Sequence, residues 1–250
     1  MMKTLKHTTL SAFILLLIPL IVTITEWQWK PFHVDCGSKL LFLVAETITY
    51  PWVLWTTLIL VSLFGWCLRC GSKSLLLLSV LMTVSLVTGQ SIKILLKDHF
   101  HSVRPYYLWL QSHNLEKVTI FSNKKSLDTK EIWHEYVLSN QTFPPWLIRH
   151  WHEATQFSFP SGHTIFSATW ALVGTGLLWP RRCYFTVIAV MIWAATVMSS
   201  RLAFGMHWSR DLFASVVLSW VLSIFTCWIL KYIRVVFLKE LQTMEKKQVI

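Results

Sequence analysis

Residues Leu75–Leu96 read LLLLSVLMTVSLVTGQSIKILL, a run of 22 residues in which Lys93 is the one charged side chain. An α-helix rises about 1.5 Å per residue, so a helix of this length reaches across the ~30 Å hydrocarbon core of a bilayer. The run therefore predicts a transmembrane helix, and with it a membrane protein rather than a soluble one.

Further stretches on both sides of this run have the same apolar character: Leu10–Ile24, Pro51–Leu68, Thr164–Trp179, Tyr184–Met198 and Leu212–Leu230. Several are shorter than the ~20 residues that a span needs, so we expect their helices to extend into the polar flanks. The whole chain is 54% hydrophobic and 14% charged, whereas a soluble domain is about 25% charged. We therefore expect an all-α, polytopic membrane protein with six transmembrane helices, in a single domain over residues 1–250.

The first apolar stretch follows Lys3 and Lys6, which is also how a signal peptide begins. Residues 23–27 read TITEW, however, and offer no cleavage site of the small-x-small type. We expect this segment to stay in the protein as its first transmembrane helix.

Basic residues are unevenly distributed among the connecting segments. The amino terminus, the segments 69–73 and 181–182, and the tail after residue 230 hold 11 Lys and Arg against two Glu, whereas residues 25–50 and 97–163 hold nine against nine acids. Because cytoplasmic loops carry the basic excess, we expect both termini in the cytoplasm and residues 98–161 outside as a small helical extracytoplasmic cap. The same bias accounts for the net charge of +11, which points to bilayer lipids rather than nucleic acid as partners.

Local sequence adds two details to this topology. Within the cap, residues 129–139 and 145–153 have a partly helical pattern. Tryptophans fall near the expected span ends, where amphipathic rings meet the membrane interface: Trp27, Trp29, Trp52, Trp109, Trp179 and Trp208.

Ionisable residues at the ends of membrane helices are candidates for function, and here they gather in three clusters. These clusters run from Lys97 to Pro105, from Phe159 to His163, and from Ser200 to Asp211. The expected topology brings all three to the outer face, although the charges that define the topology lie elsewhere in the chain. We therefore expect the clusters to form one site.

The three clusters contain groups that suit a phosphoryl ligand. Lys97, Arg104 and Arg201 are cations that would repel one another unless an anion lay between them. Guanidinium groups match phosphate oxygens in pairs, whereas an ammonium acts as a point charge. Ser161 and Gly162 stand where a helix is expected to begin, and its free N–H groups and dipole also favour phosphate.

Two histidines complete a chemical mechanism. His207 and Asp211 are four residues apart and share a face on the first turn of the expected sixth helix, so Asp211 can orient the imidazole. The other ring nitrogen is then available to attack phosphorus, and His163 on another helix can protonate the leaving oxygen. We expect a two-step transfer through a phosphohistidine, which water then hydrolyses.

No metal or other cofactor is expected, because the cations already neutralise the charge that a metal ion neutralises in other phosphoryl-transfer sites. His99-Phe-His101 and His150-Trp-His152-Glu153 have the spacing of metal ligands. No cysteine lies beside either pair, and each adjoins a single carboxylate (Asp98 or Glu153), so we expect no metal there.

The clusters resemble the three-part signature of the type 2 phosphatidic acid phosphatase superfamily: Lys97-x6-Arg104-Pro105, Pro160-Ser161-Gly162-His163 and Ser200-Arg201-x5-His207-x3-Asp211. Every signature position is present, in order and at the right spacing. The resemblance extends over nearly the whole chain and is greatest to the bacterial phosphatidylglycerophosphatases.

The resemblance implies a metal-independent phosphatase in the bacterial inner membrane. His207 would be the nucleophile, Asp211 its partner and His163 the proton donor, while the phosphate would be held by Lys97, Arg104, Ser161, Gly162 and Arg201. It implies as substrates phosphatidylglycerol phosphate, phosphatidic acid, lysophosphatidic acid, diacylglycerol pyrophosphate and undecaprenyl diphosphate.

Two alternatives stay open at this point. One is a membrane-tethered phosphatase for soluble phosphate esters. The other is a non-enzymatic lipid-binding or transport protein, which the absence of paired, interrupted inverted repeats makes less favoured.

Overall fold

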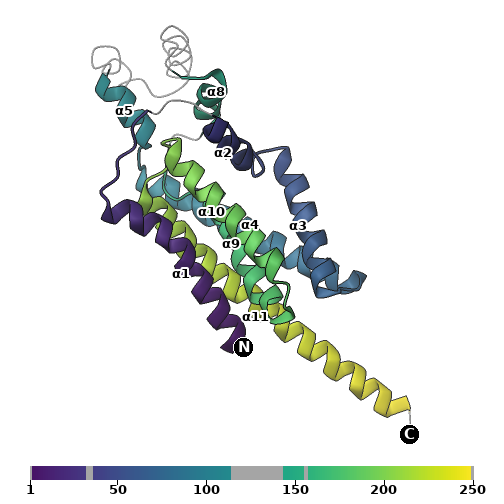
Figure 1. Cartoon of the computed structure of the whole chain (residues 1–250). Coiled ribbons are helices and arrows are strands. Elements are labelled where there is room, and N and C mark those ends of the chain that lie inside the picture. The colour runs from purple at the N-terminus through teal and green to yellow at the C-terminus, as the bar shows by residue number, and fades with distance from the viewer. Residues whose placement is uncertain (1, 32–35, 114–142, 155–156, 249–250) are drawn as a thin grey trace.

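The computed structural model describes residues 2–31, 36–113, 143–154 and 157–248, and these residues are helical almost throughout (Figure 1). The helices are α1 (Met2–Ile24), α2 (Cys36–Glu46), α3 (Trp52–Leu68), α4 (Ser72–Phe100), α5 (Pro105–His113), α8 (Pro145–Glu153), α9 (Gly162–Leu178), the 3-10 turn η1 (Trp179–Arg181), α10 (Tyr184–Ala203) and α11 (Ser209–Gln248). The described residues contain no strand beyond an isolated antiparallel bridge between Val103 and Phe157.

Four of these helices are long and apolar enough to cross a bilayer: α1, α4, α10 and the first 25 residues of α11. The prediction of a helical membrane protein is therefore confirmed. α3 and α9 coincide with the other two predicted spans but have 17 residues each. As expected, several helices extend beyond their apolar runs, and α4 continues to Phe100.

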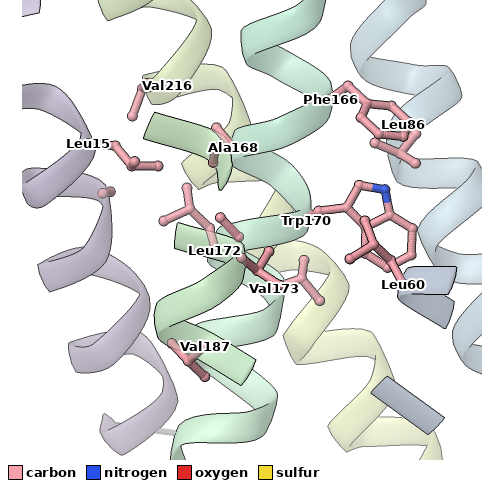
Figure 2. Packing of buried hydrophobic residues seen from close by; sticks show 14 of the residues in the cluster. Leu15, Leu60, Leu86, Phe166, Ala168, Trp170, Leu172, Val173, Val187 and Val216 are labelled. Atoms are coloured by element: carbon pink, nitrogen blue, oxygen red, sulfur yellow. The ribbon is translucent and has the colours of Figure 1, made fainter. Parts of the chain in front are cut away.

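α9 is the central helix of the bundle. It packs against α1, α3, α4, α10 and α11, and every residue from Thr164 to Gly176 is buried. Figure 2 shows Leu15 of α1, Leu60 of α3 and Val216 of α11 arranged around this helix. A helix enclosed on all sides can carry apolar and small residues around its whole circumference.

Small residues let the neighbouring helices approach α9 closely. A Cβ on Gly174 would lie 2.7 Å from Cζ of Phe64 on α3, and one on Gly176 would lie 2.8 Å from Oγ1 of Thr8 on α1. Such close approach of helices at small residues is typical of membrane bundles. It fixes the lateral position of α9, whose first residues belong to the candidate site.

The connecting segments lie at two opposite ends of the bundle (Figure 1). One end holds the amino terminus, the α3–α4 turn, η1 and the carboxyl-terminal part of α11. Here the ring of His7 contacts that of Trp179, and Sγ of Cys183 lies 3.6 Å from the Cys67 carbonyl oxygen. The other end holds α2, α5 and α8. The four segments rich in Lys and Arg thus share one end, which agrees with the charge pattern on which the predicted topology rests.

A second apolar cluster lies at the α2, α5 and α8 end, and its buried members are Trp29, Tyr106, Leu147, Trp151, Phe204 and Met206. It joins α5 and α8 to the turn between α10 and α11. α8 spans the predicted residues 145–153, whereas the prediction for 129–139 lies outside the described residues. The cluster also buries Trp29, one of the tryptophans near the predicted span ends.

Candidate active site

His207 and Asp211 form the predicted pair at the start of α11. Nδ1 of His207 lies 3.3 Å from Oδ2 of Asp211, and both side chains are buried. The expectation that both stand on the first helical turn is wrong in one respect, because α11 begins at Ser209 and His207 lies in the turn before it. Asp211 caps that turn by accepting a hydrogen bond of 3.0 Å from the Trp208 N–H on the same Oδ2.

The turn that carries His207 is held from several directions. Four consecutive carbonyl oxygens, those of residues 203–206, each accept a hydrogen bond from another segment. The donors, in that order, are Trp29 Nε1 (2.7 Å), Trp151 Nε1 (3.0 Å), the Tyr106 N–H (3.0 Å) and Arg104 Nη1 (2.8 Å). Buried carbonyl groups need such partners, so these bonds fix the backbone immediately before His207.

Gly205 permits the sharp bend of this turn. Its φ is +64°, a left-handed conformation that costs an L residue with a side chain about 1–2 kcal/mol. A Cβ at this position would also lie 2.7 Å from the indole ring of Trp29. The turn geometry and the packing of Trp29 therefore both depend on the missing side chain.

Ser161 begins α9, as the sequence predicts. Its Oγ accepts hydrogen bonds from the Thr164 N–H (3.3 Å) and from Thr164 Oγ1 (3.0 Å), while its own N–H donates to Oγ of Ser215 on α11 (2.9 Å). The next residue, Gly162, has no room for a side chain, because a Cβ there would lie 2.9 Å from Cδ of Lys93 on α4. α4, α9 and α11 thus meet at the beginning of α9.

The three predicted cations come from α4, from the segment after it and from α10. Arg201 has no exposed surface and Arg104 is buried; burial is the main cause that lowers the pKa of Arg104. Nζ of Lys97 donates a hydrogen bond to the carbonyl oxygen of Phe157. Burying cations is costly unless a partner stabilises their charge, so their concentration here favours an anionic ligand.

Unpartnered polar atoms show where such a ligand fits. Nη2 of Arg201, Nε2 of His163 and Oδ1 of Asp211 are buried without a hydrogen-bond partner, three of only six such atoms in the described residues. A native protein rarely leaves buried polar atoms in this state, and each one needs an explanation. The nitrogens of Arg201 and His163 come from α10 and α9 and can face a phosphate. Oδ1 of Asp211, which lies 3.9 Å from Nε of Arg210, can only accept hydrogen bonds and is not available to an anion.

Electrostatic interactions join the same groups. His207 lies within range of the charges of Arg104, Lys97 and Arg201, and these cations, after burial itself, hold its pKa well below the usual value of 6.5. His163 lies within range of Arg201 and His207. The structure therefore brings all three motifs together, and the lowered pKa of His207 favours its neutral imidazole form.

Several residues of this region were missed by the sequence patterns. His150, assigned there to a metal-like spacing, lies between Arg201 and Glu46 (Nε2 to Arg201 Nη1 3.0 Å; Nδ1 to Glu46 Oε1 3.2 Å). Lys93 donates to Gln90 Oε1 (2.7 Å) beside Gly162. Among the described residues, no group of three or more His, Cys, Asp or Glu side chains is placed to hold a metal ion. No spacing rule connects Glu46, His150 and Arg201, because three separate helices bring them together.

The sequence model of the PAP2 superfamily matches residues 74–234, a range that includes all three motifs. The chain belongs to the PAP2 superfamily. Phosphatidylglycerophosphatase B of Escherichia coli (strain K12) is 38% identical over 224 residues, which cover 90% of this chain and 88% of that protein. Phosphatidylglycerophosphatase B of Haemophilus influenzae is 29% identical over 226 residues, which cover 87% and 92%. This PAP2 chain is accordingly a membrane-bound phosphatase.

Proposed function

We propose that the protein hydrolyses lipid phosphates and diphosphates, without a metal, through a phosphohistidine on His207. One observation carries the proposal: the buried His207–Asp211 pair lies in a cluster of cations with unpartnered atoms of Arg201 and His163 beside it. Phosphoryl transfer through a histidine needs a nucleophile, a carboxylate that orients it, a second imidazole for proton transfer and groups that bind the phosphate.

In the first step, Nε2 of His207 attacks phosphorus while the bond to the leaving oxygen breaks. His163 in its protonated form donates a proton to that oxygen and becomes neutral, and Asp211 stabilises the imidazolium character that develops on His207. In the second step, neutral His163 takes a proton from water while the water oxygen attacks phosphorus, and the bond between phosphorus and Nε2 of His207 breaks. Inorganic phosphate leaves, and both histidines return to their starting protonation states.

The phosphate oxygens are bound by side chains and by the start of α9. Nη2 of Arg201 supplies an unpartnered donor, and Lys97 and Arg104 add positive charge that becomes more favourable as charge develops in the transition state. The Gly162 N–H belongs to the first helical turn, whose N–H groups have no acceptor within the helix. Ser161 already donates its own N–H to Ser215, and its Oγ accepts hydrogen bonds from Thr164, so its hydroxyl proton is the group that it can offer to the phosphate.

The substrates we propose carry their phosphate on a membrane lipid. The relatives named phosphatidylglycerophosphatase B make phosphatidylglycerol phosphate the first candidate; phosphatidic acid, lysophosphatidic acid, diacylglycerol pyrophosphate and undecaprenyl diphosphate offer the same chemistry. Ile94 and Leu95, on the turn of α4 before Lys97, are exposed. A lipid can therefore keep its tails against apolar helix faces while its headgroup reaches the site.

For the membrane arrangement we propose six spans in one domain, with α3 and α9 completing the four longer helices and residues 98–161 as the cap. Both termini would lie in the cytoplasm and the site on the outer side of a bacterial inner membrane. The supporting observations are the charge asymmetry of the sequence and the position of the candidate site at the end opposite the Lys- and Arg-rich segments. Lipid is then the expected partner, and nucleic acid is not.

The test is a phosphate-release assay on detergent-purified protein in the presence of EDTA. We expect phosphatidylglycerol phosphate and undecaprenyl diphosphate to be hydrolysed with a much higher kcat/KM than glycerol 3-phosphate, and His207→Ala to release no phosphate. Equal efficiency on glycerol 3-phosphate would favour a phosphatase for soluble esters. Lipid binding without phosphate release would favour a transport or lipid-binding protein.

A further inference from the structure

Arg201 is anchored on the side away from its unpartnered nitrogen. Its Nε donates to Oγ of Ser200 (3.2 Å), and its Nη1 lies 3.0 Å from Nε2 of His150. A guanidinium can only donate hydrogen bonds, so Nε2 of His150 must be the acceptor and the ring proton must stand on Nδ1. Two of the three guanidinium nitrogens therefore have protein partners, and Nη2 does not.

His150 is oriented in turn by Glu46. Its Nδ1 lies 3.2 Å from Oε1 of Glu46 at the end of α2, so the proton required on Nδ1 has an acceptor. The ring of Phe42, one turn earlier on α2, meets the imidazole edge-on at 5.4 Å between ring centres. Glu46, His150 and Arg201 thus form a continuous chain from α2 through α8 to α10.

The environment keeps His150 in the form that this chain requires. His150 is buried, with Arg201 fully buried beside it. Burial and the charge of Arg201 lower the pKa of His150, although Glu46 acts in the opposite direction. A protonated His150 would have no lone pair for Arg201 and would place a second positive charge against it.

We propose that Glu46 and His150 are positioning residues, which hold the Arg201 guanidinium so that Nη2 is presented to the phosphate of the substrate. The inference rests on the proposed function and names two residues outside the three motifs. An arginine that is already fixed loses little conformational freedom when it binds phosphate. Its charged N–H groups also need not reorient during the reaction. Because the chain begins on α2 and passes through α8, these two helices take part in phosphate binding without touching the substrate.

The test compares His150→Phe, His150→Gln and Glu46→Gln in the full-length protein. Phe keeps an aromatic ring but removes the acceptor, whereas the amide oxygen of Gln can replace Nε2. The measurements are KM and kcat for phosphatidylglycerol phosphate, the dissociation constant of inorganic phosphate by calorimetry, and Tm. His7→Phe is the matched control, because His7 also packs against an aromatic ring but lies at the opposite end of the bundle.

We expect His150→Phe to raise both KM and the dissociation constant of phosphate about tenfold, the effect of losing one hydrogen bond to a buried charged group. The change in kcat should be smaller. His150→Gln should recover most of this loss, Glu46→Gln should show a smaller weakening, and His7→Phe should behave like the wild type. The double variant Glu46→Gln/His150→Phe should be no weaker in phosphate binding than His150→Phe alone, since the two residues act as a unit.

Unchanged phosphate affinity in both His150→Phe and Glu46→Gln would overturn the proposal. Equal loss in His150→Phe and His150→Gln, accompanied by a lower Tm, would assign His150 a structural role and also overturn it. A wild-type protein that binds phosphate but hydrolyses no phosphate ester would instead contradict the proposed function. The binding measurements would then still decide whether His150 and Glu46 position Arg201.

Discussion

The indole N–H of Trp151 on α8 donates a hydrogen bond of 3.0 Å to the carbonyl oxygen of Phe204, three residues before His207. The same indole stacks on Tyr106 of α5 at 4.7 Å with nearly parallel rings. Helices α5 and α8, which follow α4 and precede α9 in the sequence, therefore support the turn that carries the proposed nucleophile.

Replacing Trp151 by Phe should keep much of this stacking while removing the donor to Phe204. A buried carbonyl that loses its partner costs about 1–3 kcal/mol, and the strain falls on the turn before His207. We expect a lower Tm together with a lower kcat. Trp228→Phe is the control, because Trp228 is exposed on α11 and stacks on Tyr232; a matching loss in both variants would mean that the bond to Phe204 has no special part.

Gly205→Ala should destabilise the same turn more strongly. The positive φ alone costs about 1–2 kcal/mol, and the new Cβ would meet the ring of Trp29 at 2.7 Å. The measurement is thermal unfolding in detergent alongside phosphate release. Gly71→Ala is the comparison, since Gly71 has a negative φ and a Cβ there would contact nothing within 4 Å. Equal effects at the two positions would contradict the role assigned to Gly205.

The acidic limb of the pH profile should lie below pH 6.5. His207 attacks as the neutral imidazole, and burial together with nearby cations lowers its pKa, so activity is retained until the pH falls through that lowered value. The unfolded chain binds this proton more readily than the folded one, so the contribution of His207 to stability is present above about pH 6.5 and is lost as the pH falls.

Arg104→Gln tests the electrostatic part of this explanation. Removing one of the cations near His207 should raise its pKa and move the acidic limb of kcat/KM to higher pH, whatever the loss in absolute rate. The measurement is the pH dependence of kcat/KM for phosphatidic acid, across the range from roughly pH 4 to 8. An acidic limb that stays in place, or moves to lower pH, would show that another group controls it.

His163→Ala should separate substrates by their leaving groups. A lipid alkoxide needs a proton as it departs, so its hydrolysis should slow by about 10²- to 10⁴-fold, whereas p-nitrophenyl phosphate should slow much less. The measurement is kcat for both esters in the variant and the wild type. Equal losses on the two esters would assign His163 to phosphate binding instead of proton transfer.

Much of the fold and of the site follows from local sequence. The limits of α8 and the start of α9 were predictable because Pro145 opens one helix and Ser161 caps the other. The pairing of His207 with Asp211 was predictable because they are four positions apart in the chain. Such features depend on neighbours along the chain, which is the information that a sequence displays directly.

The remaining features depend on contacts between distant segments. α2 has only 11 residues, so it is too short to be recognised in the sequence as a long apolar run, yet it supplies Glu46. The sequence places Trp29 near the end of a predicted span, but it does not show that Nε1 of Trp29 donates to the Ala203 carbonyl or that its ring packs on Gly205. Likewise His150 acquires its role from Arg201, a partner on another helix that no spacing rule identifies.

The central claim is that the phosphoryl group of the substrate is transferred to His207 during turnover. The most direct measurement is rapid quenching of the purified protein with 32P-labelled phosphatidic acid, followed by peptide mapping of the retained label. We predict one labelled peptide containing His207, with phosphate that is lost in acid and kept in base, and no label in His207→Ala. Full activity without any retained label, or an active His207→Ala protein, would contradict the account.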